Sequence, residues 1–198
     1  MNEISHNHGQ GPVLTEAERI RAVGFWKILK EDFYQHRRDL SRPGLQTLWV
    51  HRIGVYATTL PKPFRWPLDI FYFLGWRFCR AFYGIEMRRT ANIGRRFEIG
   101  HQHCIVIHDY GRYGDDCVVR QGVTFGISNE WERGKGPVIG NNVSFGVGCV
   151  IVGNVVVGDN VTIGPNCVVS SDVPANRTLF VPPPRVIPKE VAETSETD

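Results

Sequence analysis

Apolar residues recur at every sixth position along the second half of the chain. One apolar series runs in a single phase, through Ile139, Phe145, Ile151, Val157, Ile163 and Val169. A second series of small or β-branched residues follows four positions after each member of the first, at Val143, Cys149, Val155, Val161, Cys167 and Val173. A helix would show a period near 3.6 and an alternating strand a period of about two. The period of six predicts a solenoid, in which each hexad supplies one short strand and one corner.

The same period begins earlier in a less regular form, through Ile93, Ile99, Tyr113, Val119 and Phe125. Between residues 99 and 113 it slips by two positions, within a stretch, EIGHQHCIVIHDYG, that holds three histidines. The period is interrupted again at residues 127–137 (ISNEWERGKGP), which are polar and contain glycine. We predict a projecting loop there, and loops on a rigid scaffold are frequent sites of function.

Before residue 84 the apolar spacing is helical. Thr15 and Glu18 have the spacing of a capping box, which predicts a helix start. Apolar residues then recur three or four positions apart on one predicted helix face, at Ile20, Val23, Trp26, Leu29 and Phe33. The RPG sequence at 42–44 is predicted to end this helix. A second helix, LQTLWVHRIGVYATTL, is predicted to stop at a proline cluster, Pro61, Pro63 and Pro67.

A third predicted helix, LDIFYFLGWRFCRAFYG, is rich in aromatic residues and contains Arg77 and Arg80. Two interpretations remain open: a packed helix with arginines at its rim, or contact of residues 66–83 with a membrane surface or a lipid-linked substrate. The chain is therefore divided into four predicted parts. These are a disordered N-terminus (1–14), an α-helical region (15–84), a solenoid domain (85–187) with a loop at 127–137, and a solvated tail (188–198).

Composition limits the class of protein and the compartment. The chain is 42% hydrophobic and 22% charged, which suits one globular domain or a main domain with a smaller one. A net charge of +3 gives no reason to expect a nucleic-acid partner. The five cysteines are scattered without a Cys-x-x-Cys pair, which favours a reducing compartment. The N-terminus has no signal-peptide pattern and no apolar run reaches the length of a membrane span, so we expect a cytoplasmic protein.

Five parts of the sequence resemble, in order, the serine acetyltransferases, which are hexapeptide-repeat acyltransferases. They are FYQHRRD with PGLQTLWVHRIGVY, GIEMRRTANIGRRFEIGH, GDDCVVRQGVTFG, PVIGNNVSFGVGCVIVGNVVVGDNVTIGPNCVV and VPPPRVI. The resemblance implies a mainly β fold, a left-handed parallel β-helix preceded by a short α-helical region. This hand is an exception to the right-handed rule for parallel strands. It also implies acetyl-CoA bound between adjacent solenoids. The helical region is shorter than in typical serine acetyltransferases, so we expect a homotrimer rather than paired trimers.

The resemblance places the family's general base on His101 and its partner carboxylate on Glu86. Imidazole changes its charge near neutral pH, which suits a group that takes a proton from an acceptor hydroxyl as its oxygen attacks a thioester. A carboxylate partner orients the ring and stabilises the imidazolium that forms. The alternative for His101 is a histidine on the outer face of a strand. The expected activity is direct, acetyl-CoA-dependent O-acetyl transfer.

A zinc site formed by the three histidines and Cys104 is the competing interpretation of the same stretch. If this stretch is a strand, His101 and His103 share one face and Cys104 points to the other. We therefore expect no metal, and we expect His103 and His108 to line a cleft or face solvent.

The residues around the base bear on the acceptor. Asp39 matches a family carboxylate that holds the acceptor's amino group. The family often has Asp before the catalytic His, where this chain has Gly100, and Arg-His before the proline that follows the loop, where this chain has Lys135 and Gly136. A site without these ion-pairing groups loses selectivity for a zwitterion. We therefore expect a sugar hydroxyl of a polysaccharide or glycan precursor as the acceptor. The alternatives are L-serine in cysteine biosynthesis, an amino sugar, or a non-catalytic trimeric scaffold.

The resemblance also implies acetyl-CoA contacts along the solenoid. Gly126, Ile127 and Val147 match positions that contact the pantetheine arm. Basic side chains at Arg133, Lys135 and Arg185 are candidates for its phosphates, or are simply solvated.

Overall fold

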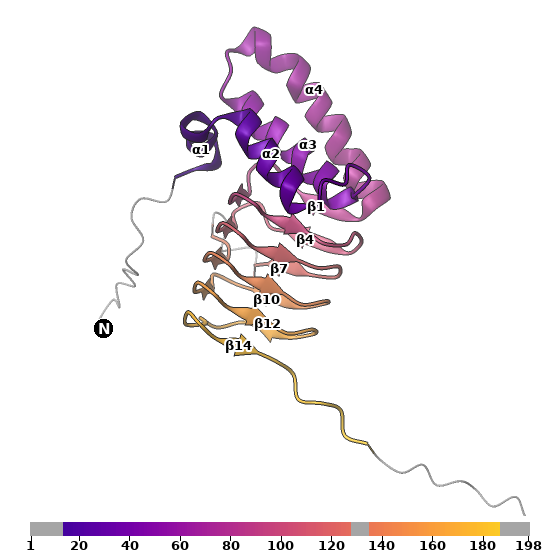
Figure 1. Cartoon of the computed structure of the whole chain (residues 1–198), viewed down its shortest axis with the longest axis vertical. Helices are drawn as coiled ribbons and strands as arrows, with labels where there is room; N and C mark the ends of the chain where they lie inside the picture. The colour runs from indigo at the N-terminus through magenta and orange to yellow at the C-terminus, as the bar shows by residue number, and fades with distance from the viewer. Residues whose placement is uncertain (1–13, 128–134, 187–198) are drawn as a thin grey trace, which may run out of the picture.

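The computed structural model describes residues 14–127 and 135–186. Helices lie at one end of a stack of short strands (Figure 1). They are α1 (Glu16–Val23), α2 (Phe25–Gln35), α3 (Pro43–Thr58) and α4 (Lys62–Phe78), followed by a π-helical turn, η1 (Cys79–Tyr83). The predicted disordered N-terminus and solvated tail fall outside the described residues, except for Leu14, and so does most of the predicted loop.

The strands form three parallel sheets, which we call sheets A, B and C, and the chain visits them in that order in every coil. Sheet A contains β1 (Ile85–Met87), β4 (Ile105–Ile107), β7 (Thr124–Gly126), β10 (Val150–Val152) and β13 (Val168–Val169). Sheet B contains β2 (Asn92–Ile93), β5 (Arg112–Tyr113), β8 (Val138–Ile139) and β11 (Val156–Val157). Sheet C contains β3 (Glu98–Ile99), β6 (Val118–Val119), β9 (Ser144–Phe145), β12 (Thr162–Ile163) and β14 (Thr178–Leu179). The predicted left-handed parallel β-helix is confirmed.

The period of six arises because every hexad turns the same two side chains into the core. All positions of both apolar series named above are buried. Each inward residue stacks on its partner one coil away, as Phe125 does on Ile151. The aromatic members pack edge to face, with 4.8 Å between the ring centroids of Phe125 and Phe145. The predicted slip is also confirmed: Ile85 pairs with Ile105, twenty positions on, whereas a regular coil pairs Val150 with Val168, eighteen positions on.

The corners between sheets B and C need a left-handed residue in each coil. Asn142, Asn160 and Asn176 take φ of 54°, 57° and 58° there. Asparagine tolerates this conformation better than most residues because its amide can hydrogen-bond locally. The amides also form a ladder: Asn142 donates to Asn160 (2.9 Å) and Asn160 donates to Asn176 (3.1 Å).

The helical region differs from the prediction in three places, the first being that α2 already ends at Gln35, so that RPG at 42–44 begins α3 and does not end the helix before it. The predicted capping box is present, with Thr15 and Glu18 bonded to each other's backbone N–H. The helix that follows is broken at Gly24, whose φ of 97° is outside the helical range, so the predicted single apolar face is divided between α1 and α2 and Trp26 is exposed. Pro67 does not stop a helix either, because α4 begins at Lys62 and contains it.

Side chains of the helical region hydrogen-bond to the first coil. The N–H of Ile93 in β2 donates to Glu16 Oε2 (3.0 Å), and its carbonyl accepts from Arg52 Nη1 (3.0 Å). The N–H of Ile99 in β3 donates to His36 Nε2 (3.2 Å). These contacts occupy backbone groups that an uncovered first strand would offer to another chain. The helical region is thus the cap of the solenoid.

Arg52 is the centre of this cap and is 1% exposed. Its guanidinium donates to Asp32 Oδ2 (3.0 Å), Glu16 Oε1 (2.7 Å) and the carbonyl of Gly94 (2.6 Å). Burial alone would raise the pKa of Glu16, but His51 and Arg52 outweigh it and lower the pKa to about 2. Burial raises the pKa of Asp32, although Arg52 opposes the shift. The buried ion pairs therefore hold α1, α2 and α3 together, and Glu16 and Arg52 join this cluster to the solenoid through backbone hydrogen bonds.

Candidate active site

The predicted base lies at the corner between sheets C and A, which we call the histidine corner (residues 100–104, 120–123, 146–149 and 164–167). Its turns stack through backbone hydrogen bonds, for example from Gly122 N–H to the His103 carbonyl (3.1 Å) and from Asn166 N–H to the Val147 carbonyl (2.9 Å). In the first coil this corner contains the two additional residues of the slip, because Val106 is seven positions after Ile99, whereas their register partners, Thr124 and Val119, are five positions apart.

The additional residues turn back through two left-handed positions, His103 (φ 77°) and Cys104 (φ 55°). Non-glycine residues adopt this conformation at a cost, which the surroundings must offset. Here His103 N–H donates to the Tyr83 carbonyl (2.8 Å) and Ile105 N–H donates to the Gly84 carbonyl (3.0 Å), which ties the turn to the end of η1.

The strand argument against a metal site was therefore wrong in its premise, because His101, His103 and Cys104 lie in a turn and not on a strand. Over residues 14–127 and 135–186, no group of three or more His, Cys, Asp or Glu side chains is arranged to hold a metal ion.

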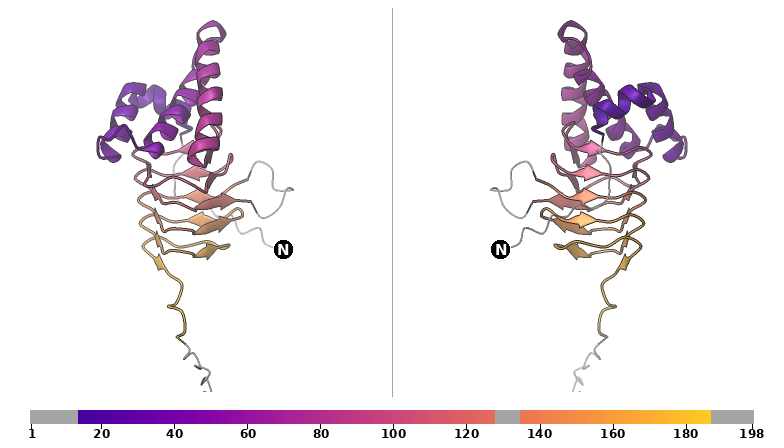
Figure 2. Two further views of the ribbon diagram at one scale, coloured as in Figure 1. Left: turned by 90° about the vertical axis from the view of Figure 1, so that its right-hand side faces the viewer. Right: turned by 90° about the vertical axis from the view of Figure 1, so that its left-hand side faces the viewer.

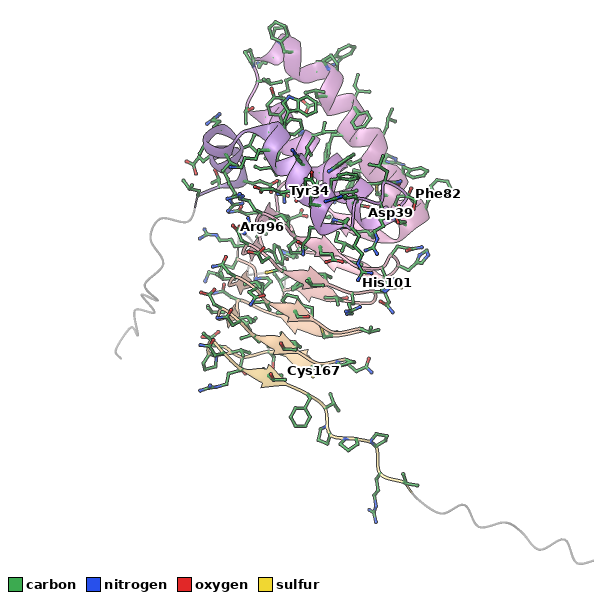
Figure 3. All side chains as sticks on the ribbon, viewed as in Figure 1. Tyr34, Asp39, Phe82, Arg96, His101 and Cys167 are labelled. Carbon is green, nitrogen blue, oxygen red and sulfur yellow. The ribbon has the colours of Figure 1, made fainter. Side chains whose placement is uncertain are left out.

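His101 is exposed and follows Gly100, whose N–H continues the ladder by donating to the Val119 carbonyl (2.9 Å). Figure 3 labels His101 in the coils just beneath the helical region. A Cβ added to Gly100 would meet only the Val119 carbonyl oxygen, at 3.7 Å, which is ordinary contact. The space beside the base is consequently open, and a side chain would fit there.

Glu86 lies in β1 between two buried residues and points outward from sheet A. Its carboxylate is 3.3 Å from Arg80 Nε. Within the described part of the chain no ion pair joins it to His101. Sequence reasoning missed Arg80 as its partner. The sequence signal for this pair was the glycine at position 84, because a glycine permits the left-handed turn (φ 61°) that the chain makes between Arg80 and Glu86.

Asp39 lies in the turn between α2 and α3 and is exposed. Ser41 donates to it from its hydroxyl (2.6 Å) and its N–H (2.9 Å), which lowers the pKa of the Asp39 carboxyl. Arg42 links it to the solenoid, at 3.8 Å from Asp39 and 3.6 Å from Glu98 in β3. Asp39 is thus connected, through one arginine, to a carboxylate three positions before His101. Nothing in the spacing of these residues along the chain predicts this link.

His36 fixes the strand that leads to the base. Its Nδ1 lies 2.8 Å from the Asp32 carbonyl, and its Nε2 accepts from Ile99 N–H. The ring is therefore neutral, with its proton on Nδ1. Burial lowers its pKa, although its bond to the Asp32 carbonyl opposes the shift.

The predicted acetyl-CoA residues are spread over the chain. Val147 belongs to the histidine corner, below His101. Gly126, Ile127 and Lys135 lie at the opposite end of sheet A, on either side of residues 128–134, and Arg133 is outside the described residues. Arg185 is in the extended segment after β14, which runs away from the solenoid at the end opposite the cap (Figure 1). A single chain does not bring these residues together.

Residues 136–171 match the family model described as bacterial transferase hexapeptide (six repeats). The chain is 38% identical over 113 residues to a serine acetyltransferase of Synechocystis sp., an alignment that covers 57% of this chain and 43% of that protein. It is 39% identical over 75 residues to a candidate colanic acid biosynthesis acetyltransferase, WcaB, of Escherichia coli, which covers 38% of this chain and 46% of that protein.

Among solved structures, serine acetyltransferase isoform 3 of Entamoeba histolytica, in complex with cysteine, superimposes with a TM-score of 0.68 at 22% identity. The superposition covers 88% of this chain and 64% of that chain. At this identity the likeness is one of fold. The chain spans about half the length of the curated relatives it matches.

Proposed function

We propose that this chain transfers an acetyl group from acetyl-CoA to an acceptor hydroxyl, as its match to the hexapeptide transferase model and its similarity to serine acetyltransferases suggest. The observation that carries the proposal is the exposed His101 in the enlarged first turn of the histidine corner. That turn is held by backbone hydrogen bonds to the end of η1 on one side and to the next coil on the other, so the imidazole stands on a rigid support.

In the proposed reaction, His101 takes the proton of the acceptor hydroxyl while the oxygen forms a bond to the thioester carbonyl carbon. The tetrahedral intermediate then collapses, the carbon–sulfur bond breaks, and the departing thiolate takes the proton from the imidazolium. The products are the acetyl ester and coenzyme A. No acyl-enzyme intermediate is required, since the acceptor itself is the nucleophile.

Glu86 is proposed to stabilise the imidazolium of His101 once Arg80 has released the Glu86 carboxylate. The Arg80 side chain is 54% exposed and, among the residues that the structure describes, makes one ion pair, so exchange of that pair costs little in water. In the absence of substrate, this ion pair with Arg80 holds the Glu86 carboxylate outward. Arg80 is therefore a positioning residue that sequence reasoning did not identify.

Two acceptors are candidates, and the names of the relatives favour L-serine over the sugar that we expected. The matched Synechocystis protein is a serine acetyltransferase, and the Entamoeba structure contains cysteine, a close analogue of serine. The second candidate is a saccharide hydroxyl, which is supported by the open space at Gly100, the missing Arg-His pair before Pro137 and the similarity to WcaB.

Acetyl-CoA is proposed to bind between two solenoids of a homotrimer. The histidine corner and the Gly126 end of sheet A are at opposite ends of that sheet in one chain. Apposition of neighbouring chains would bring the base of one chain to the Gly126 end of the other. Lys135 would then be available for phosphates.

The test is a coenzyme A release assay with L-serine and with a panel of sugars. His101→Asn is expected to lower kcat by about 100-fold or more, because it removes the imidazole that would take the proton of the acceptor hydroxyl. His103→Asn is the matched control, since asparagine tolerates the left-handed φ at that position. Near-wild-type turnover of His101→Asn would show that the base is wrongly assigned.

Gly100→Asp then separates the two acceptors. If the acceptor is a saccharide, the new carboxylate fills the open space and lowers kcat/KM for the sugar, while activity on L-serine rises. If the wild-type chain already prefers L-serine over every sugar, the saccharide candidate is rejected.

A further inference from the structure

We propose that the outer face of α4 docks on the surface of an anionic membrane. We define this outer face as the exposed residues between positions 64 and 78. They are Phe64, Trp66, Pro67, Ile70, Phe71, Phe73, Leu74, Arg77 and Phe78. Arg77 is the only charged member of this face. Trp66 is 69% exposed and Leu74 is 61% exposed, and α4 has no buried residue at all. A contiguous apolar face of this kind marks an interaction site.

The polarity of α4 is the reverse of that of an ordinary surface helix. Its polar contacts point inward: Asp69 pairs with Arg65 (2.7 Å) and with Arg89, and the Tyr72 hydroxyl accepts from Arg89 N–H (3.0 Å). On the same inner side, Gly75 lies against Val50 of α3. A helix of a soluble monomer keeps its apolar face inward and its charges outward. The arrangement in α4 therefore implies an apolar partner on the outside.

The positive charge of residues 62–82 favours one kind of apolar partner over another. Residues 62–82 contain four basic side chains, Lys62, Arg65, Arg77 and Arg80, against a single acid, Asp69. This excess equals the net charge of +3 of the whole chain. Because Arg77 lies on the outer face, two copies of α4 placed face to face would bring two Arg77 side chains together, whereas an anionic lipid surface attracts such cations. Aromatic rings with flanking Lys and Arg are the composition of helices that lie in a membrane interface.

A hollow at the end of α4 suits a phosphate headgroup. It has a volume of about 570 Å³ and is lined by Trp76, Arg77, Phe78, Arg80, Ala81 and Phe82. Arg77 lies over the Phe73 ring (5.5 Å) and Arg80 over the Trp76 ring (5.6 Å), so both guanidiniums are held beside aromatic walls. An anionic headgroup could be bound there while the rings enter the acyl boundary.

The geometry indicates docking on the surface and not insertion across it. α4 extends beyond the solenoid at the capped end, so its outer face is clear of the strands (Figure 2). Over the described residues, no helix is long and apolar enough to cross a membrane. If the proposed transfer reaction is correct, Arg80 connects this surface to Glu86, and docking would place the reaction beside the membrane. That last step alone rests on the proposed function.

The test is sedimentation of the full chain with lipid vesicles. Vesicles of phosphatidylcholine with one quarter phosphatidylglycerol are expected to bind at least about tenfold more chain than pure phosphatidylcholine, and added salt should weaken this binding. The triple variant Trp66→Gln, Phe71→Gln and Leu74→Gln is expected to lose at least about tenfold in partition coefficient. The matched control, Trp26→Gln, Phe180→Gln and Val181→Gln, removes equally exposed residues elsewhere and should bind as the wild type does.

Two results would overturn the proposal, and neither depends on the acetyl acceptor or on catalysis. One is equal binding of wild type and triple variant to anionic vesicles. The other is a smaller particle in solution for the triple variant, measured by light scattering without lipid, which would show that a second copy of the chain covers this face.

Discussion

The cap and the solenoid have interiors of opposite chemical character. The solenoid core consists of apolar side chains that repeat from coil to coil, such as Phe125 on Ile151. The cap has a charged centre, in which Arg52, Glu16 and Asp32 are all nearly inaccessible to solvent. Apolar contacts are non-directional and tolerate exchange, whereas a buried ion pair is satisfied only by its own partners. The comparison teaches that the solenoid core can vary in its apolar side chains, whereas the cap depends on particular charged partners.

The largest effect is expected from Arg52→Met, which breaks the centre of the cap. The substitution leaves Glu16 and Asp32 buried without their cation, so the free energy of unfolding should fall by about 3–5 kcal/mol. Urea denaturation followed by circular dichroism measures this change. Arg95→Met is the control, because the pair of Arg95 with Glu31 is partly exposed and its loss should cost less than about 1 kcal/mol. An equal cost for both variants would contradict a special role of the junction.

Ile151→Ala tests the apolar core of the solenoid. Ile151 is fully buried and stacks between Phe125 and Val169, so we expect a loss of about 2–5 kcal/mol. The double variant with Arg52→Met should show additive costs in urea denaturation, because the two sites share no partner. A strong deviation from additivity would mean that the cap and the solenoid are one cooperative interior.

Acidification should affect the cap first. The pKa of Glu16 is lowered to about 2 from an ordinary value of 4.5, so its stabilising contribution is present above pH 4.5 and is lost as the pH falls toward 2. Protonation of His36, whose pKa is below the ordinary 6.5, acts in the same direction, whereas the raised pKa of Asp32 acts against it. Helical ellipticity measured against pH should show a shallower acid transition in Glu16→Gln. Identical profiles for the variant and the wild type would refute the assignment.

The smallest effect is expected in the asparagine ladder. Asn160→Ala loses two amide hydrogen bonds and places alanine in a left-handed conformation. The free energy of unfolding should therefore fall by about 1–3 kcal/mol. Asn160→Gly keeps the conformation and loses only the ladder, so thermal unfolding should place it between the wild type and the alanine variant. If glycine proves worse than alanine, the left-handed backbone is not the reason for asparagine at this corner.

The features that sequence reasoning predicted are those whose cause is local. A hexad determines which of its own side chains point inward, so the buried series, the capping box at Thr15 and the slip before Ile105 could be read from spacing alone. The break at Gly24 was missed because the apolar spacing continues across it, while the single residue with φ of 97° decides the backbone.

The candidate site was predictable only in part, for the same reason. His101 and Glu86 came from an ordered motif, and their roles remain proposals. The partners of this region join residues far apart in sequence, such as His36 with Ile99 and Arg42 with Glu98. The spacing of these residues does not indicate which side chains they contact, because those contacts depend on how the cap packs on the solenoid.

The cap also gives the molecule a direction of growth. Since Glu16, Arg52 and His36 occupy the backbone groups of the first coil, a strand cannot be added at that end without dismantling the junction. Coils could be duplicated or deleted only toward the other end, where each new hexad needs no more than the same inward residues. The distance from the cap to His101 would not change in such variants. Coils added or removed beyond those that carry Gly126, Lys135 and Val147 would therefore leave the first coil and its histidine in place.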